Sequence, residues 1–163
     1  MLFEGGEAMN PMDEVIKGWL QHRMVVHDLL DLVDDEHINF KPWDDAYSLA
    51  DLAIHIARSM GTFVKMVKSG EFSPLKDEIN YQSIADVREI VKRYTDITKQ
   101  DMKGIYKFQL NAEVEFNHIN APGSYWLSNA MDHEIHHKGQ LFTYVRMIGV
   151  EKVPFFMKLP SEV

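Results

Sequence analysis

The sequence contains no cysteine, and this absence removes several kinds of site at once. Disulfide bonds, thiolate nucleophiles and cysteine-rich metal sites are excluded, so any metal ion must be held by histidine, aspartate or glutamate. Long apolar runs are also missing, since none approaches the roughly 18 residues of a membrane-spanning helix. Residues 1–9 lack the basic and apolar segments of a signal peptide and are expected to form a flexible leader. We therefore expect a cytoplasmic protein with no membrane partner.

Positive charge is scarce as well. The chain has 17 lysine and arginine residues against 25 aspartates and glutamates, which gives a formal net charge of −8. Nucleic-acid binding depends mostly on clustered lysine and arginine, and the sequence has no basic run, so we expect no nucleic-acid partner. A chain of 163 residues is long enough for one domain with a buried core, which we place at residues 10–163.

The sequence does contain several helix-capping motifs. Asn10-Pro11 is a typical helix start, and Ser48-x-x-Asp51 and Ser83-x-x-Asp86 have the form of capping boxes. The expected helices cover residues 11–35, residues 48–69, a segment that opens at Ser83, and residues 122–148. Residues 106–121 lack helical periodicity and are predicted to form a long irregular connection. The chain is therefore predicted to be all-α, a four-helix bundle with a long connection before its last helix.

The most informative stretch is residues 132–140 in the expected last helix. His133 and His137 are four residues apart, so their side chains leave the same face of a helix and could both reach one metal ion at roughly 2 Å. Helical projection places both on the inward stripe, together with Gln140 and Tyr144. Either they are buried histidines hydrogen-bonded to the backbone or to a tyrosine hydroxyl, or they are metal ligands.

A metal site open to chemistry usually takes three protein ligands. His55 is the best candidate for the third, because it lies at the edge of an apolar stripe in the helix 48–69. His136 lies about 60° from the direction of His133 and is expected beside the site rather than in it. Four other histidines have no partner at metal spacing and are expected at the surface or in packing: His22, His27, His37 and His118.

The same stretch also reads His133-Glu134-x-x-His137, the motif of zinc hydrolases in which the glutamate is the general base. The longer zinc-protease patterns need a further ligand downstream, but no histidine follows His137. Little of the chain predicts strand, which a protease needs to align a peptide. We therefore disfavour a protease and expect Glu134 in the pocket around the metal.

These motifs together resemble the DinB/YfiT-like family of small bacterial four-helix proteins. The resemblance covers residues 11–150 and rests on His133-x-x-x-His137-x-Gly139-Gln140-Leu141, Tyr144 to Gly149, Phe40-Lys41-Pro42 and Ser48 to Ile56, and less specifically on Trp19 and Arg23. It implies an up-down-down-up bundle, often a homodimer. It also implies a divalent-metal site, typically zinc or nickel, with His55, His133 and His137 as ligands.

The activity implied by the resemblance is a metal-dependent transferase that uses a low-molecular-weight thiol on a small-molecule substrate. Three neutral imidazoles leave a metal its full charge, so a bound thiol or water would lose its proton near neutral pH. Hydrolysis by metal-bound water is one alternative, and a non-catalytic metal-binding bundle of the stress response is the other. The sequence identifies no catalytic residue beyond the metal ligands and no organic cofactor.

A second apolar strip lies roughly opposite the histidines on the last helix and consists of Met131, Ile135 and Phe142. Lys138 falls on the opposite side from the histidines as well, in a solvent-like position. The strip is covered either by the chain's own connection and tail or by a second copy. We favour the homodimer interface, because exposed apolar strips usually find partners.

Overall fold

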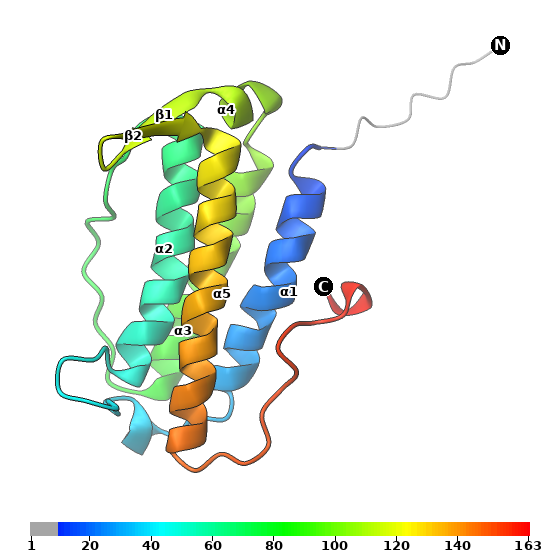
Figure 1. Cartoon of the computed structure of the whole chain (residues 1–163). Coiled ribbons are helices and arrows are strands. Elements are labelled where there is room, and N and C mark those ends of the chain that lie inside the picture. Colours follow the sequence, from blue (N-terminus) through cyan, green and yellow to red (C-terminus); the bar gives the residue numbers. More distant parts are fainter. Residues whose placement is uncertain (1–9) are drawn as a thin grey trace.

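The structure is a computed structural model that describes residues 10–163, so the leader expected at residues 1–9 lies outside the described residues. Four long helices form a bundle: α1 (Asp13–Leu30), α2 (Leu49–Ser69), α3 (Ile84–Lys103) and α5 (Gly123–Met147) (Figure 1). In Figure 1, α1 and α5 run in one direction and α2 and α3 in the other. The predicted all-α bundle is confirmed, and its helices follow the up-down-down-up order.

Capping hydrogen bonds fix the starts of α2 and α3. The Ser48 hydroxyl accepts a hydrogen bond from the Asp51 amide at 3.0 Å, and Ser83 and Asp86 form a reciprocal capping box. The prediction that α1 reaches residue 35 is wrong, because the helix ends at Leu30. Asp35 instead lies in the short 3₁₀ turn η1 (Asp35–His37), where its carboxylate accepts a hydrogen bond of 2.7 Å from the Ile84 amide at the start of α3.

The connection expected to be irregular is in fact ordered. It contains α4 (Lys107–Asn111) and an antiparallel hairpin of β1 (Glu113–Phe116) and β2 (Ile119–Pro122), in which Phe116 pairs with Ile119. Asn117 and His118 have φ angles of 50° and 64°, as a two-residue hairpin turn requires. The hairpin buries the side chains of Val114 and Ala121 in the part of the core that also contains Val67 and Trp126.

At Gly123 the start of α5 lies so close to α4 and α2 that no side chain fits there. A Cβ atom at Gly123 would overlap the Gln109 carbonyl oxygen and lie 2.8 Å from Val67 Cγ1. The hairpin and α4 are thereby fixed against α2 and α5 at one end of the bundle.

A second connection also shapes the molecule. Because α2 and α3 are parallel, residues 70–83 must return along the length of the bundle before α3 begins (Figure 1). α2 packs against both α3 and α5, and α1 packs against the same two helices. In the described part of the chain, none of the helices combines the length and the apolarity that crossing a membrane requires.

α5 is covered on more sides than the sequence suggests. Met131 and Phe142 pack against the chain's own core clusters, while Ile135 is 37% exposed. Lys138, predicted to face solvent, is only 3% exposed. Its amine donates a hydrogen bond to His22 Nδ1 on α1 at 2.8 Å and another to the carbonyl oxygen of Phe156. The reason is that the chain beyond α5 returns across this face of the bundle.

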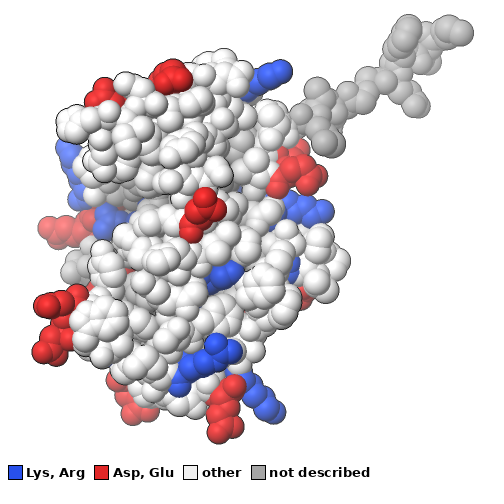
Figure 2. Space-filling model, viewed as in Figure 1, with Lys and Arg blue, Asp and Glu red and all other residues white. Residues whose placement is uncertain are grey.

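Charge is dispersed over the surface. Among the described residues on the face seen in Figure 2, acidic and basic side chains are interspersed, and neither sign gathers into a continuous patch there. Most of the described residues on this face carry no formal charge. A strong electrostatic field for a polyanionic partner is therefore not a feature of this face.

Candidate metal centre

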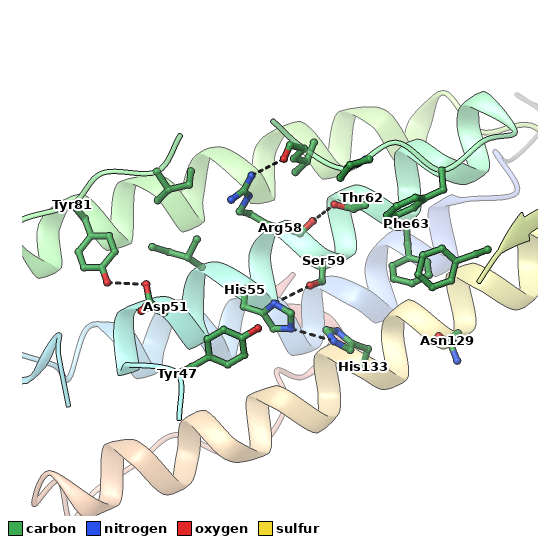
Figure 3. A pocket seen from close by; sticks show the side chains of 16 residues that line it. Tyr47, Asp51, His55, Arg58, Ser59, Thr62, Phe63, Tyr81, Asn129 and His133 are labelled. Atoms are coloured by element: carbon green, nitrogen blue, oxygen red, sulfur yellow. Dashed lines mark hydrogen bonds between the residues drawn. The ribbon is translucent and has the colours of Figure 1, made fainter. Parts of the chain in front are cut away.

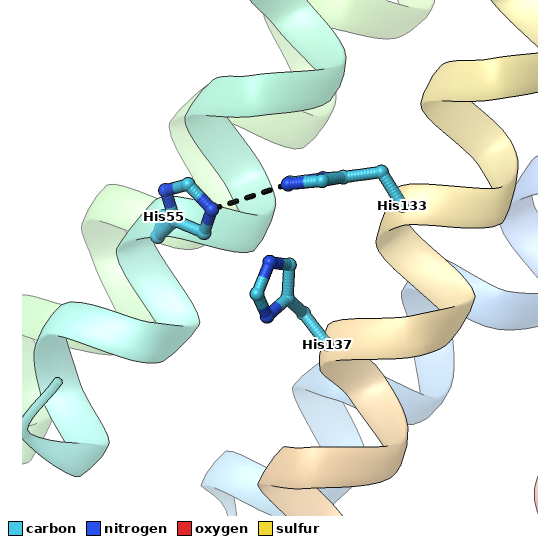
Figure 4. A group of neighbouring side chains, drawn as sticks. All are labelled: His55, His133 and His137. Atoms are coloured by element: carbon cyan, nitrogen blue, oxygen red, sulfur yellow. Dashed lines mark hydrogen bonds between the residues drawn. The ribbon is translucent and has the colours of Figure 1, made fainter. Parts of the chain in front are cut away.

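Three histidines from two helices face one point between α2 and α5 (Figure 4). His55 comes from α2, and His133 and His137 come from successive turns of α5. One ring nitrogen of each lies within 4.8 Å of those of the other two, and His55 Nε2 lies 3.3 Å from His133 Nε2. The structure thus brings together the three residues that the sequence proposed as ligands.

The spacing of these nitrogens fits a tetrahedral ion. Zinc binds imidazole nitrogen at about 2.0–2.1 Å, so two nitrogens on one tetrahedral ion are roughly 3.3 Å apart. The His55–His133 distance of 3.3 Å already has this value. The remaining distances, at most 4.8 Å, need a shift of about 1.5 Å or less, which small rotations of the rings supply.

Neighbouring side chains orient two of the rings. The Gln140 side-chain oxygen can only accept, so the contact of 2.6 Å with His137 Nδ1 means that this nitrogen carries the proton. His55 Nδ1 lies 3.5 Å from the Ser59 hydroxyl. A proton on His137 Nδ1 leaves the Nε2 lone pair of this ring free for an ion, which is the usual arrangement around metal-binding histidines. The partners are therefore not the backbone or tyrosine groups that the alternative interpretation required.

The surroundings of two of the rings disfavour protonation. Burial, together with the nearby His137 and His133 rings, lowers the pKa of His55 to about 4. Burial likewise lowers the pKa of His133, with His137 and His136 acting in the same direction. Metal ligation requires deprotonated imidazoles, so these environments favour an ion over protons.

Other residues named from the sequence lie in different places. His136 is exposed and its ring is 5.0 Å from that of His137, outside the three-histidine group. Gln140 contacts His137 directly. Tyr144 is instead 6% exposed and packs edge-on against Phe40 in the core, at a centroid distance of 5.8 Å.

Glu134 does not belong to the pocket, and that prediction is wrong. Its carboxylate is 1% exposed and pairs with Arg23, with Nε–Oε1 at 2.7 Å and Nη2–Oε2 at 2.8 Å. The Trp19 indole donates a third hydrogen bond of 2.9 Å. Because these contacts turn the carboxylate toward α1, Glu134 stabilises the packing of α1 on α5 and is not placed as a general base.

A cavity of about 780 Å³ adjoins the histidines. His55 and His133 form part of its wall between α2 and α5 (Figure 3). Tyr47, from the loop before α2, also lines it and stacks on the His55 ring with centroids 5.0 Å apart and planes at 21°. Sequence reasoning missed Tyr47, because a loop residue has no periodicity that would reveal its neighbours.

Comparison with known proteins gives consistent matches over the whole bundle. The model of the DinB family matches residues 9–161. The uncharacterized protein YjoA of Bacillus subtilis (strain 168) is 30% identical over 149 residues, which are 90% of this chain and 96% of that protein. The crystal structure of YjoA, a DinB-like protein, superposes with a TM-score of 0.82 at 32% identity and covers 90% of this chain and 100% of that one.

Two more distant solved structures share the fold. A DinB-like protein from Bacillus cereus ATCC 10987 has a TM-score of 0.72 at 19% identity, covering 88% of this chain and 96% of its own. A conserved protein from Enterococcus faecalis has a TM-score of 0.67 at 17% identity, covering 88% of this chain and 100% of its own. At these identities the likeness extends to the fold alone.

Proposed function

Since the chain belongs to the DinB family, we propose that His55, His133 and His137 bind one divalent metal ion and that the protein is an enzyme acting at that ion. The observation that carries the proposal is the convergence of three imidazoles, with one nitrogen pair at 3.3 Å, beside a cavity of about 780 Å³. Zinc or nickel fits this donor set best, because imidazole suits both ions.

The cavity favours chemistry over a purely structural ion. Structural zinc sites are closed by four protein ligands, whereas catalytic sites have three and leave a position for water or substrate. The group here has three histidines, and two of them border the cavity. A bound ion would act as a Lewis acid that lowers the pKa of a thiol or water beside it.

The residues around the cavity would bind and orient the substrate. Ser59, Thr62 and Asn129 supply polar groups on the two helices that carry the histidines. Tyr47 covers one face of the His55 ring and shields it from water. We propose a transferase in which a low-molecular-weight thiol is the nucleophile, consistent with a chain that has no cysteine of its own. Hydrolysis is the alternative for the same site.

Metal binding is tested first, by titrating the metal-free protein with Zn²⁺ against a competing chelator. We expect one ion per chain for the wild type and at least a 100-fold loss of affinity when His55, His133 or His137 is replaced by alanine. His136→Ala is the matched control, because this exposed histidine lies next to the group without belonging to it. Equal affinities in all four variants would contradict the proposal.

The reaction class is tested with the metal-loaded protein. Product that forms from an electrophilic substrate only when a small thiol is added supports the transferase. Hydrolysis of an activated ester without thiol supports the hydrolase. Metal binding with neither activity would indicate a non-catalytic bundle. A homodimer and a cytoplasmic location stay predictions made from the sequence.

A further inference from the structure

The cavity beside the histidines is long, and its two ends differ in chemistry. Along α2 the lining residues recur every three or four positions from Asp51 to Phe63, so the cavity follows one face of the helix over about three turns. Figure 3 shows Asp51 and Tyr81 at one end, Phe63 at the other, and the histidine wall between them. The residues returning from α2 to α3 form the opposite wall.

The two charged side chains in the cavity wall both make contacts within the chain. Among the described residues that line the cavity, Asp51 and Arg58 carry a formal charge. Asp51 accepts a hydrogen bond of 2.8 Å from the Tyr81 hydroxyl. The Arg58 guanidinium donates to the Leu75 carbonyl at 3.2 Å and to the Asp77 carboxylate at 3.0 Å. The Arg58 charge is therefore paired with a carboxylate, whereas Asp51 keeps its negative charge at the end of the cavity away from Phe63.

The other end is aromatic. Phe63 of α2, Phe72 of the return segment and Phe116 of β1 all line it. The ring centroids of Phe63 and Phe116 are 5.3 Å apart, and those of Phe72 and Phe116 are 4.8 Å apart. These rings come from three separate segments of the chain. Phe72 is nevertheless 43% exposed, so this end presents aromatic surface that the protein itself leaves uncovered.

The distance between the histidines and this aromatic end sets the length of a ligand that would use both. Phe63 follows His55 by eight residues on the same helix, which corresponds to about 12 Å along its axis. An atom at the metal and a ring against Phe72 would be joined by a spacer of roughly four to six atoms. A ligand without such a spacer reaches one end of the cavity but not both.

We infer that the substrate of the proposed reaction is a molecule with an aryl group, joined by a flexible spacer to the group that reacts beside His55 and His133. This inference rests on the proposed function, because the histidines define where the reacting group lies. Phe63, Phe72 and Phe116 bind the ring through apolar and edge-to-face contacts.

The experiment measures the binding of hydroxamic acids to the zinc-loaded protein by calorimetry. Acetohydroxamic acid probes the metal alone. Benzohydroxamic acid adds a ring without a spacer, hexanohydroxamic acid adds a chain without a ring, and 5-phenylpentanohydroxamic acid has both. We expect the last compound to bind about tenfold or more tightly than each of the others, as expected when an aromatic ring is buried.

Variants locate the effect. Phe72→Ala is expected to remove the tenfold gain while the affinity for acetohydroxamic acid stays unchanged. Phe155→Ala, which removes a ring that is 67% exposed on the C-terminal segment, is the control and should leave all affinities unchanged. If acetohydroxamic acid binds but the ring and spacer add nothing, the aryl inference is wrong and the metal site stands. If the protein binds no zinc, the proposed function fails and the inference fails with it.

Discussion

The Glu134 carboxylate is predicted to stabilise the fold and to have no part in chemistry, and Glu134→Gln separates these roles. The pair that Glu134 forms with Arg23 is buried, with side-chain exposures of 1% and 0%. Breaking a buried ion pair by neutralising one partner costs about 3–5 kcal/mol, because the other charge stays buried without compensation. The glutamine oxygen can still accept from Trp19, so we expect the lower part of this range, about 3 kcal/mol.

Urea unfolding followed by circular dichroism measures this cost. For a small domain the free energy of unfolding changes by about 1–3 kcal/mol per molar urea, so the midpoint of Glu134→Gln should fall by roughly 1–3 M. Asp132→Asn is the control, since it neutralises an exposed carboxylate on the same helix and should change stability by about 0.5 kcal/mol or less. Replacing both Arg23 and Glu134 by methionine should be less destabilising than the single change.

Zinc affinity of the folded variant provides the second readout. Because Glu134 faces α1 and not the cavity, Glu134→Gln should bind zinc as the wild type does. A variant that keeps the wild-type urea midpoint but loses all activity of the zinc-loaded protein would refute this reasoning. In that case Glu134 would be acting as the general base that its motif first suggested.

The remaining predictions concern the orientation of a ligand, acid stability and packing. Gln140→Ala should weaken zinc binding by about 10–100-fold, since it frees the ring that Gln140 holds, and His136→Ala should change it by about twofold at most in the same chelator competition. Burial lowers the pKa of His27 below its ordinary 6.5, and nearby Arg23 lowers it further. As the pH falls through 6.5, this histidine therefore binds a proton more readily in the unfolded chain than in the folded one, and the folded state loses stability. The urea midpoint of the metal-free protein should therefore be lower at pH 5.5 than at pH 7.5, and His27→Gln should reduce that difference; a midpoint independent of pH would contradict it. Gly123→Ala should overpack the junction and lower the free energy of unfolding by about 1–3 kcal/mol. Gly139→Ala, with open space around the new methyl group, should raise the free energy of unfolding by about 0.5–1 kcal/mol. Equal effects of the two glycine changes would show that the hairpin junction tolerates a side chain.

The histidines could be found from the sequence because their spacing survives folding. Two side chains four residues apart on a regular helix always lie on the same face, so helical geometry alone predicts that His133 and His137 lie side by side. Finding His55 required further information, because local spacing does not show which residue of another helix will face these two histidines. Its position on an inward stripe and the family resemblance supplied that information.

Glu134 and Lys138 show what helical projection cannot reveal. A projection gives the angle between side chains but not which element covers each angle. α5 is contacted by α2, by α1 and by the C-terminal segment, so Glu134, expected in the pocket, is 1% exposed, and Lys138, expected at the surface, is 3% exposed. Their partners Arg23 and His22 lie on another helix, more than 100 residues away in the chain.

The cavity was also out of reach of the sequence. Tyr47, Phe72 and Tyr81 lie in segments without regular structure, where neither spacing nor hydropathy predicts direction. The hairpin that carries Phe116 was missed because its turn is Asn117-His118 and not the Asn-Gly pair that marks such turns. The chemistry of the pocket therefore depends on the parts of the chain whose conformation is set by tertiary packing.

The most direct test of the metal centre is anomalous X-ray diffraction from zinc-loaded crystals, recorded on both sides of the zinc absorption edge. We predict one peak per chain between α2 and α5, about 2.0–2.1 Å from a ring nitrogen of each of His55, His133 and His137, with a further ligand on the cavity side. Crystals without a peak at this position, or with zinc bound elsewhere on the chain while His55 and His133 stay hydrogen-bonded to each other, would contradict the metal site and the enzyme proposed on it.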